Sequence, residues 1–173
     1  MADAIVSTCD LPPEALVGLR LIQRQTAWMS RLLDSSVDHT PVAVVDLGDT
    51  VAEPCSLAPV RSPFEVHFDK LDEAPVLVDP VGLERVARNL MDNATRAVFD
   101  GGQVEVRVRA EEQDALLEVA DSGPGFGHLA PHQGHGLVGV RRFVDRFGGG
   151  LSCGTSWLGG ALVTLRLPIA VGW

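Results

Sequence analysis

Two asparagines, Asn89 and Asn93, are the side chains of this sequence whose type and spacing most directly suggest chemistry. They lie inside a helical pattern of apolar residues. A spacing of four places both amides on one side of that helix, beside the face that packs. Side-chain amides offer neutral oxygen ligands to Mg²⁺, a hard cation that binds oxygen and keeps much of its water. The pair therefore predicts a ligand site along one helix.

Two glycine-rich segments follow the asparagines. The sequence Asp-Ser-Gly-Pro-Gly at 121–125 comes directly after an apolar strand pattern, and Gly-His-Gly-Leu at 134–137 precedes a second helical pattern. Glycine lets backbone N–H groups come close to phosphates. The Walker motif G-x-x-x-x-G-K-[ST] occurs nowhere in the chain. The asparagines and glycines together predict a nucleotide-phosphate site that does not use a Walker motif.

Helices and strands in mixed order must position these residues. The fold class that they predict is α+β, a two-layer α/β sandwich in which helices cover one face of a mixed sheet. The Asn-bearing helix begins near Pro80 and ends at Asp100-Gly101-Gly102. The other predicted helices are 47–52, which Pro54 should end, and 139–147, which three glycines stop. The predicted strands are 42–45, 64–68, 76–78, 104–108, 116–120, 151–153 and 162–167.

Length and composition narrow the class of protein. The 173 residues are 46% hydrophobic, which supports a folded core and a single domain with a short appended element. The formal net charge of −9 argues against nucleic-acid binding. Three cysteines without C-x-x-C spacing fit a reducing compartment. No signal peptide is evident, and no apolar run approaches the roughly 20 residues that span a bilayer. We expect a cytoplasmic protein that does not insert into membranes.

In their order and spacing, Asn-x-x-x-Asn-Ala, Asp-x-Gly-x-Gly, Gly-x-Gly-Leu and the closing strand after Gly159-Gly160 resemble a known site. They are similar to the N, G1 and G2 boxes of the ATP-binding domain of sensor histidine kinases, in the superfamily shared with gyrase, MutL and the anti-sigma-factor kinases. The resemblance runs from about Asp79 to Pro168. It implies ATP and Mg²⁺ as ligands.

The resemblance also assigns roles to single residues. It implies that Asn93 holds Mg²⁺ and that Asp121 accepts a hydrogen bond from the adenine amino group. Asn89 stands where ATP-hydrolysing members carry glutamate; because an amide is no base at neutral pH, this chain looks more like a kinase than a hydrolase. Arg96, which can neutralise phosphate charge, stands where the family often has lysine. The implied catalytic residues are Asn89, Asn93 and Arg96, and the implied nucleotide-binding residues add Asp121, Gly123, Gly125, Gly134, His135, Gly136 and Leu137.

The lid between Phe126 and Gln133 departs from the family pattern. It is short, and His132 takes the place of the first glycine of the G2 box. With His128 and His135 it raises zinc as a minor alternative to phosphate contact or plain loop polarity. Ala161 stands where the family usually places threonine, so one hydroxyl near the base is missing.

Residues 1–40 read as a helical segment ahead of an ATP-binding domain at 41–173. Apolar residues alternate at three- and four-residue spacing from Ala15 to Leu33. The segment resembles the second helix of a dimerisation hairpin, which allows a homodimer; a helix packed on its own domain explains the pattern equally well.

A partner must supply the histidine that accepts the phosphoryl group. No histidine has the helical setting of a phosphoacceptor, so the sequence predicts a histidine kinase catalytic domain that acts on another chain or is a fragment. Its partners would be a histidine-containing dimerisation domain or sensor protein and, through it, a response regulator. Two alternatives remain open at this point, an anti-sigma-type protein serine kinase and a non-catalytic ATP-sensing module.

Overall fold

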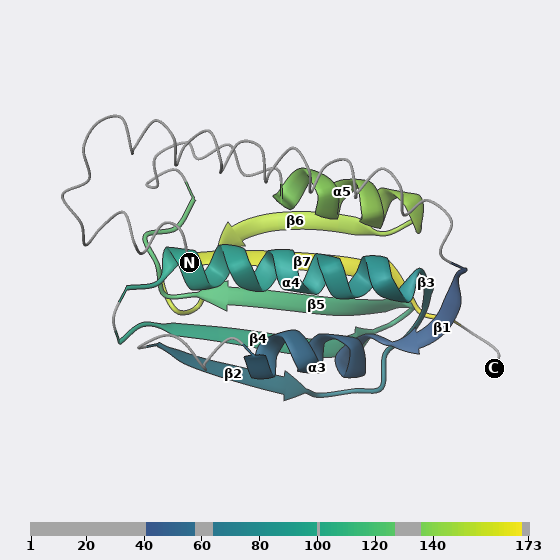
Figure 1. Cartoon of the computed structure of the whole chain (residues 1–173), viewed down its shortest axis with the longest axis horizontal. Helices are drawn as coiled ribbons and strands as arrows, with labels where there is room; N and C mark the ends of the chain where they lie inside the picture. Colours follow the sequence, from purple (N-terminus) through teal and green to yellow (C-terminus); the bar gives the residue numbers. More distant parts are fainter. Residues whose placement is uncertain (1–40, 58–63, 100, 127–135, 171–173) are drawn as a thin grey trace, which may run out of the picture. The chain divides into compact units, whose positions relative to one another are not determined.

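Within the residues that the structure describes, five strands form one mixed sheet, and three helices lie on one of its faces (Figure 1). The computed structural model describes residues 41–57, 64–99, 101–126 and 136–170. These residues belong to a single compact unit that begins at Pro41. The predicted two-layer α/β sandwich is confirmed. The N-terminal helix lies outside the described residues, so the division at residue 40 stays a prediction.

The strand order of the sheet is β2-β4-β5-β7-β6. β2 runs parallel to β4, and the remaining neighbours are antiparallel. β4 and β5, the predicted strands 104–108 and 116–120, form an antiparallel hairpin within the sheet. The bounds are β2 Glu65–Lys70, β4 Gln103–Glu111, β5 Asp114–Asp121, β6 Gly150–Thr155 and β7 Ala161–Pro168.

The alternation of buried and partly exposed side chains along β4 shows which face of the sheet packs against the core. Val104, Val106 and Val108 are fully buried, whereas Glu105 and Arg107 point to the other face. Strand side chains alternate between faces, so one face packs under the helices and the other carries long charged side chains.

Helix α4 (Pro80–Ala97) carries the two asparagines. Asp79 caps it by accepting a hydrogen bond from the Val81 N–H at 3.0 Å, and Pro80 takes the first turn, where its missing N–H costs nothing. The apolar stripe of the helix packs on the sheet: Leu83, Val86, Ala87, Leu90, Met91 and Ala94. Asn89 and Asn93 lie at the margin of this stripe and are half-buried.

Helix α5 (Gly136–Arg146) begins three residues earlier than the predicted start at Gly139. Gly139 is exposed, so it is simply a helical residue on the solvent side. The predicted glycine stop is confirmed. Gly148 has a φ of +70°, and the Gly149 N–H donates to the Val144 carbonyl at 2.9 Å, which is the backbone arrangement that glycine favours after a helix.

Two short strands, β1 (Ala43–Asp46) and β3 (Pro75–Val78), pair with each other and stand apart from the five-stranded sheet. A single bridge between Val76 and Ile169 joins them to the end of β7. The sequence predicted both strands but placed them in one sheet with the others. Which strands pair depends on contacts between segments far apart in the chain, which local patterns do not encode.

Helix α3 (Leu47–Leu57) follows β1 directly and runs through Pro54, so the predicted end before that proline is wrong. Proline removes one helical hydrogen bond. Burial of Val51, Pro54 and Cys55 against the core offsets that loss in a helix held by its tertiary contacts.

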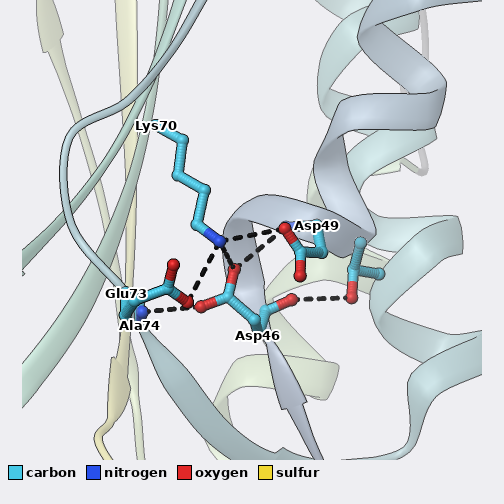
Figure 2. A network of polar contacts seen from close by, with 6 residues as sticks. Asp46, Asp49, Lys70, Glu73 and Ala74 are labelled. Carbon is cyan, nitrogen blue, oxygen red and sulfur yellow. Dashed lines mark hydrogen bonds and ion pairs between the residues drawn. The ribbon is translucent and has the colours of Figure 1, made fainter.

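Asp46 fixes the junction between β1 and α3 (Figure 2). Its carboxylate accepts hydrogen bonds from the N–H groups of Ala74 at 2.8 Å and Asp49 at 3.0 Å. The Lys70 ammonium lies 3.0 Å from the same carboxylate, 2.9 Å from Asp49 and 3.1 Å from Glu73. Burial alone would raise the pKa of Asp46, but these hydrogen bonds and the Lys70 charge outweigh it and lower that pKa.

Candidate ATP-binding site

The two asparagines face the start of α5. A Cβ built on Gly136 would lie 3.5 Å from Asn93 Nδ2, 3.7 Å from Asn93 Oδ1 and 4.0 Å from the Asn89 Cβ. Because Gly136 has no side chain, it places no side-chain atom against the Asn93 amide. The structure thus brings the N box on α4 and the end of the G2 box together, although more than 40 residues separate them in the chain.

Asp121 is the last residue of β5 and is only 5% exposed. Its Oδ1 accepts hydrogen bonds from the N–H groups of Gly123 at 2.8 Å and Ala161 at 3.1 Å. Two backbone donors on one oxygen fix the orientation of the carboxylate. Asp-Ser-Gly forms a local turn closed by the Gly123 N–H, and the Ala161 contact ties this turn to a strand 40 residues away.

Glycines let the chain pass close to its neighbours around Asp121. A Cβ on Gly123 would lie 2.5 Å from the carbonyl oxygen of Ala97, so the segment after β5 touches the last turn of α4. Gly125 has a φ of +78°, a conformation that favours glycine. The G1 box is therefore held against both α4 and the end of the sheet.

Two residues absent from the predicted site, Ser156 and Gly160, turn out to hold Asp121 in place. The Ser156 hydroxyl donates to the Asp121 carbonyl at 2.6 Å, and the Gly160 N–H donates to the same oxygen at 3.1 Å. A Cβ on Gly160 would lie 2.3 Å from Asp121 Oδ1. The Gly159-Gly160 pair in the closing motif was the available signal for Gly160, whereas a lone serine in a loop gave none.

The other predicted site residues are placed as follows. Arg96 is exposed on α4, and its guanidinium lies 3.9 Å from the Asp92 carboxylate, a loose pair at the surface. Leu137 packs against the core and so anchors the start of α5. Gly134 and His135 lie outside the described residues, as do His128 and His132, so their roles stay predictions.

Among the described residues, no group of three or more His, Cys, Asp or Glu side chains could hold a metal ion.

An apolar cavity of about 460 Å³ lies away from these residues, between β3 and the far ends of α5 and β7. Its lining includes Leu77, Phe147, Leu167 and Ile169. None of the predicted site residues lines it, so the cavity is separate from the candidate ATP-binding site.

Residues 78–171 match the model of the family described as histidine kinase-, DNA gyrase B- and HSP90-like ATPase. The chain belongs to this family. The kinship predicted from the three boxes is confirmed, and the family implies that the site binds ATP. Within this family the chain is similar to sensor histidine kinases.

A signal transduction histidine-protein kinase/phosphatase, MprB of Mycobacterium ulcerans, is 33% identical over 171 residues, which cover 82% of this chain and 33% of that protein. A solved structure of a mycobacterial sensor histidine kinase MprB superposes with a TM-score of 0.66 at 24% identity, covering 73% of this chain and 98% of that one. The ATP-binding domain of PrrB from Mycobacterium tuberculosis gives a TM-score of 0.63 at 22% identity, over 75% of this chain and 98% of that one. Both structural likenesses support the fold.

The chain spans about a third of the length of the curated relatives that it matches. Over the part of the chain that the structure describes, no helix is both long and apolar enough to cross a membrane. The similarity to the curated relatives therefore concerns a part of each of those proteins.

Proposed function

We propose that the chain is the catalytic, ATP-binding part of a two-component histidine kinase, working in the cytoplasm. It binds Mg²⁺-ATP and transfers the γ-phosphoryl group to a histidine on another chain or on a segment beyond this sequence. A histidine-containing dimerisation domain would receive the phosphoryl group and pass it to a response regulator. The names of the curated relatives favour histidine over serine as the acceptor.

One observation carries this proposal: the Asn93 amide faces the side-chain-free Gly136 at the start of α5. A half-buried amide opposite a residue without a side chain suits an oxygen ligand for Mg²⁺, which prefers neutral and anionic oxygen and keeps several waters. When bound, the metal supplies positive charge that stabilises the phosphates. Asn93 would hold it, and Asn89, one turn earlier on the same face, would hydrogen-bond to the phosphates or to metal-bound water.

Asp121 would select the base. Backbone N–H groups fix its Oδ1, and we assign its Oδ2 to the adenine amino group. Gly123 lets this segment pass close to α4, and Gly125 adds no side chain beside it, which would leave room for the ring. With the base and the phosphates positioned in this way, the protein contributes orientation and charge stabilisation to phosphoryl transfer.

The incoming nucleophile would be an imidazole nitrogen. Its bond to the γ-phosphorus forms as the bond from that phosphorus to the β–γ bridging oxygen breaks, and ADP leaves with the electron pair. The imidazole then loses the proton of its other ring nitrogen. His67 is the one histidine among the described residues, and it lies exposed on edge strand β2 beside Glu65 rather than on a helix. The described residues therefore offer no histidine on a helix, and the proposal takes the acceptor from elsewhere.

Water is a poor competitor for the phosphoryl group in this proposal. The Asn89 amide cannot take a proton from water at neutral pH. We expect negligible ATP hydrolysis by the isolated chain.

Calorimetric titration of ATP with and without Mg²⁺ tests the metal assignment without requiring the partner. Wild type should bind Mg²⁺-ATP more tightly than ATP alone, and Asn93→Ala should abolish most of that difference. Arg88→Ala removes an exposed side chain from the same helix and is the matched control. An unchanged Mg²⁺ dependence in Asn93→Ala would show that the asparagine is not a metal ligand.

A further inference from the structure

The turn between β6 and β7 closes on itself and on Asp121. Its ends are joined by the Ser156 N–H donating to the Gly160 carbonyl at 2.9 Å and the Gly159 N–H donating to the Ser156 carbonyl at 3.1 Å. Three further hydrogen bonds, from Ser156, Gly160 and Ala161, run from this turn and the first residue of β7 to Asp121. The turn therefore holds the backbone of Asp121 through Ser156 and Gly160, and the adjoining Ala161 N–H, together with that of Gly123, holds its carboxylate.

Trp157, within this turn, reaches a different strand. Its indole Nε1 donates a hydrogen bond to Glu105 Oε2 on β4, and the Arg107 guanidinium lies 4.3 Å from the centre of its ring. Glu105 and Arg107 are also paired with each other. Indole, carboxylate and guanidinium thus form a closed group of three, in which each member contacts the other two.

The sheet register places this group directly behind the site. Glu105 pairs with Ala120, and Ala120 pairs with Leu162 on β7. Ala120, which lies between them on β5, is fully buried although it points away from the helices. Asp121 is the next residue along β5, on the helix-bearing face.

Charge strengthens the attachment. Burial alone would raise the pKa of Glu105, but the Trp157 hydrogen bond and the Arg107 charge outweigh it and lower that pKa. Glu105 is therefore a charged acceptor with only 16% of its side chain exposed. A hydrogen bond to a charged, partly buried carboxylate is stronger than a neutral bond at the surface.

We propose that Trp157 is a positioning residue for nucleotide selectivity. By attaching the Ser156–Gly160 turn to β4, it holds Asp121 in the orientation that meets the adenine amino group. This inference rests on the proposed function, in which Asp121 contacts that amino group. Trp157 itself does not touch the base in this proposal. It acts from the opposite face of the sheet.

Paired nucleotides separate this role from a general effect on folding. ATP and purine riboside triphosphate differ only in the 6-amino group, so the ratio of their dissociation constants measures the contact that Asp121 makes. Trp157→Ala should lower the preference for ATP about three- to tenfold, the range expected for one lost hydrogen bond. Trp157→Phe keeps a ring over Arg107 but lacks the N–H, so it should fall between Trp157→Ala and wild type.

Leu77→Ala is the matched control, since Leu77 is 46% exposed against 45% for Trp157 and lies on β3. Thermal melting of each variant shows that it is folded. If Trp157→Ala weakens the binding of both nucleotides equally, or of neither, the Trp157 contacts do not position Asp121 and the inference is wrong. Asp121→Asn belongs in the same series: if it leaves the ratio unchanged, the adenine assignment in the proposed function fails instead.

Discussion

Replacing Gly160 with alanine should damage both the fold and the site. The new Cβ would lie 2.3 Å from Asp121 Oδ1, 2.5 Å from the Asp121 carbonyl oxygen and 2.6 Å from the Gly123 nitrogen. To relieve this clash, the Asp121 carboxylate and the neighbouring backbone would have to move by about 1 Å, although hydrogen bonds already fix both. Overpacking of this kind costs about 1–3 kcal/mol, and one lost hydrogen bond adds about 1 kcal/mol.

The expected loss of stability is therefore about 3 kcal/mol, which corresponds to a fall in melting temperature of roughly 10 °C for a unit of this length. ATP affinity should fall about ten- to a hundredfold, because a displaced Asp121 no longer meets the adenine amino group with a charged hydrogen bond. Differential scanning calorimetry and isothermal titration measure the two effects.

Gly154→Ala is the control for the same chemical change. Gly154 is exposed on β6, and a Cβ there meets nothing within 4 Å. Both substitutions restrict the unfolded chain equally, so the difference between them reports the native state alone. If the two variants melt together and bind ATP equally, the close packing of Gly160 on Asp121 is wrong.

Two further predictions concern residues outside the site. Asp46→Asn should destabilise the protein by about 1–2 kcal/mol at pH 7, relative to the exposed-carboxylate control Asp69→Asn. Because folding lowers the pKa of Asp46, its contribution is complete above the unfolded pKa of about 4 and disappears as the pH falls through the folded value. Urea unfolding should thus show the gap in stability between wild type and Asp46→Asn closing as the pH falls below about 4, and a constant gap would contradict the assigned charge. Burial raises the pKa of Cys55 to about 12, so iodoacetamide at pH 8 should leave Cys55 unmodified in the folded protein and modify it in urea, as read by peptide mass spectrometry. Equal modification in both states would show that the α3–α4 contact opens readily.

Local patterns in the sequence were enough to predict most of the helices and strands and to show which face of α4 packs on the sheet. The period of the apolar residues from Leu83 to Ala94 fixes which face of α4 packs, and with it the half-buried margin where Asn89 and Asn93 lie. Gly148-Gly149-Gly150 predicted the end of α5 because only glycine takes the left-handed backbone there easily. The order and spacing of the boxes were enough to identify the family.

Tertiary structure decided what joins these elements. Pairing of β1 with β3, rather than with the main sheet, depends on contacts between segments about 30 residues apart. Pro54 remains inside α3 because burial outweighs its local preference. The support behind Asp121 comes from Ala161, 40 residues away, and Trp157 meets Glu105 across 52 residues. A sequence states which residue types are available at a site, but distances between distant segments exist only once the sheet has formed, so the groups that hold Asp121 in place emerge from the fold.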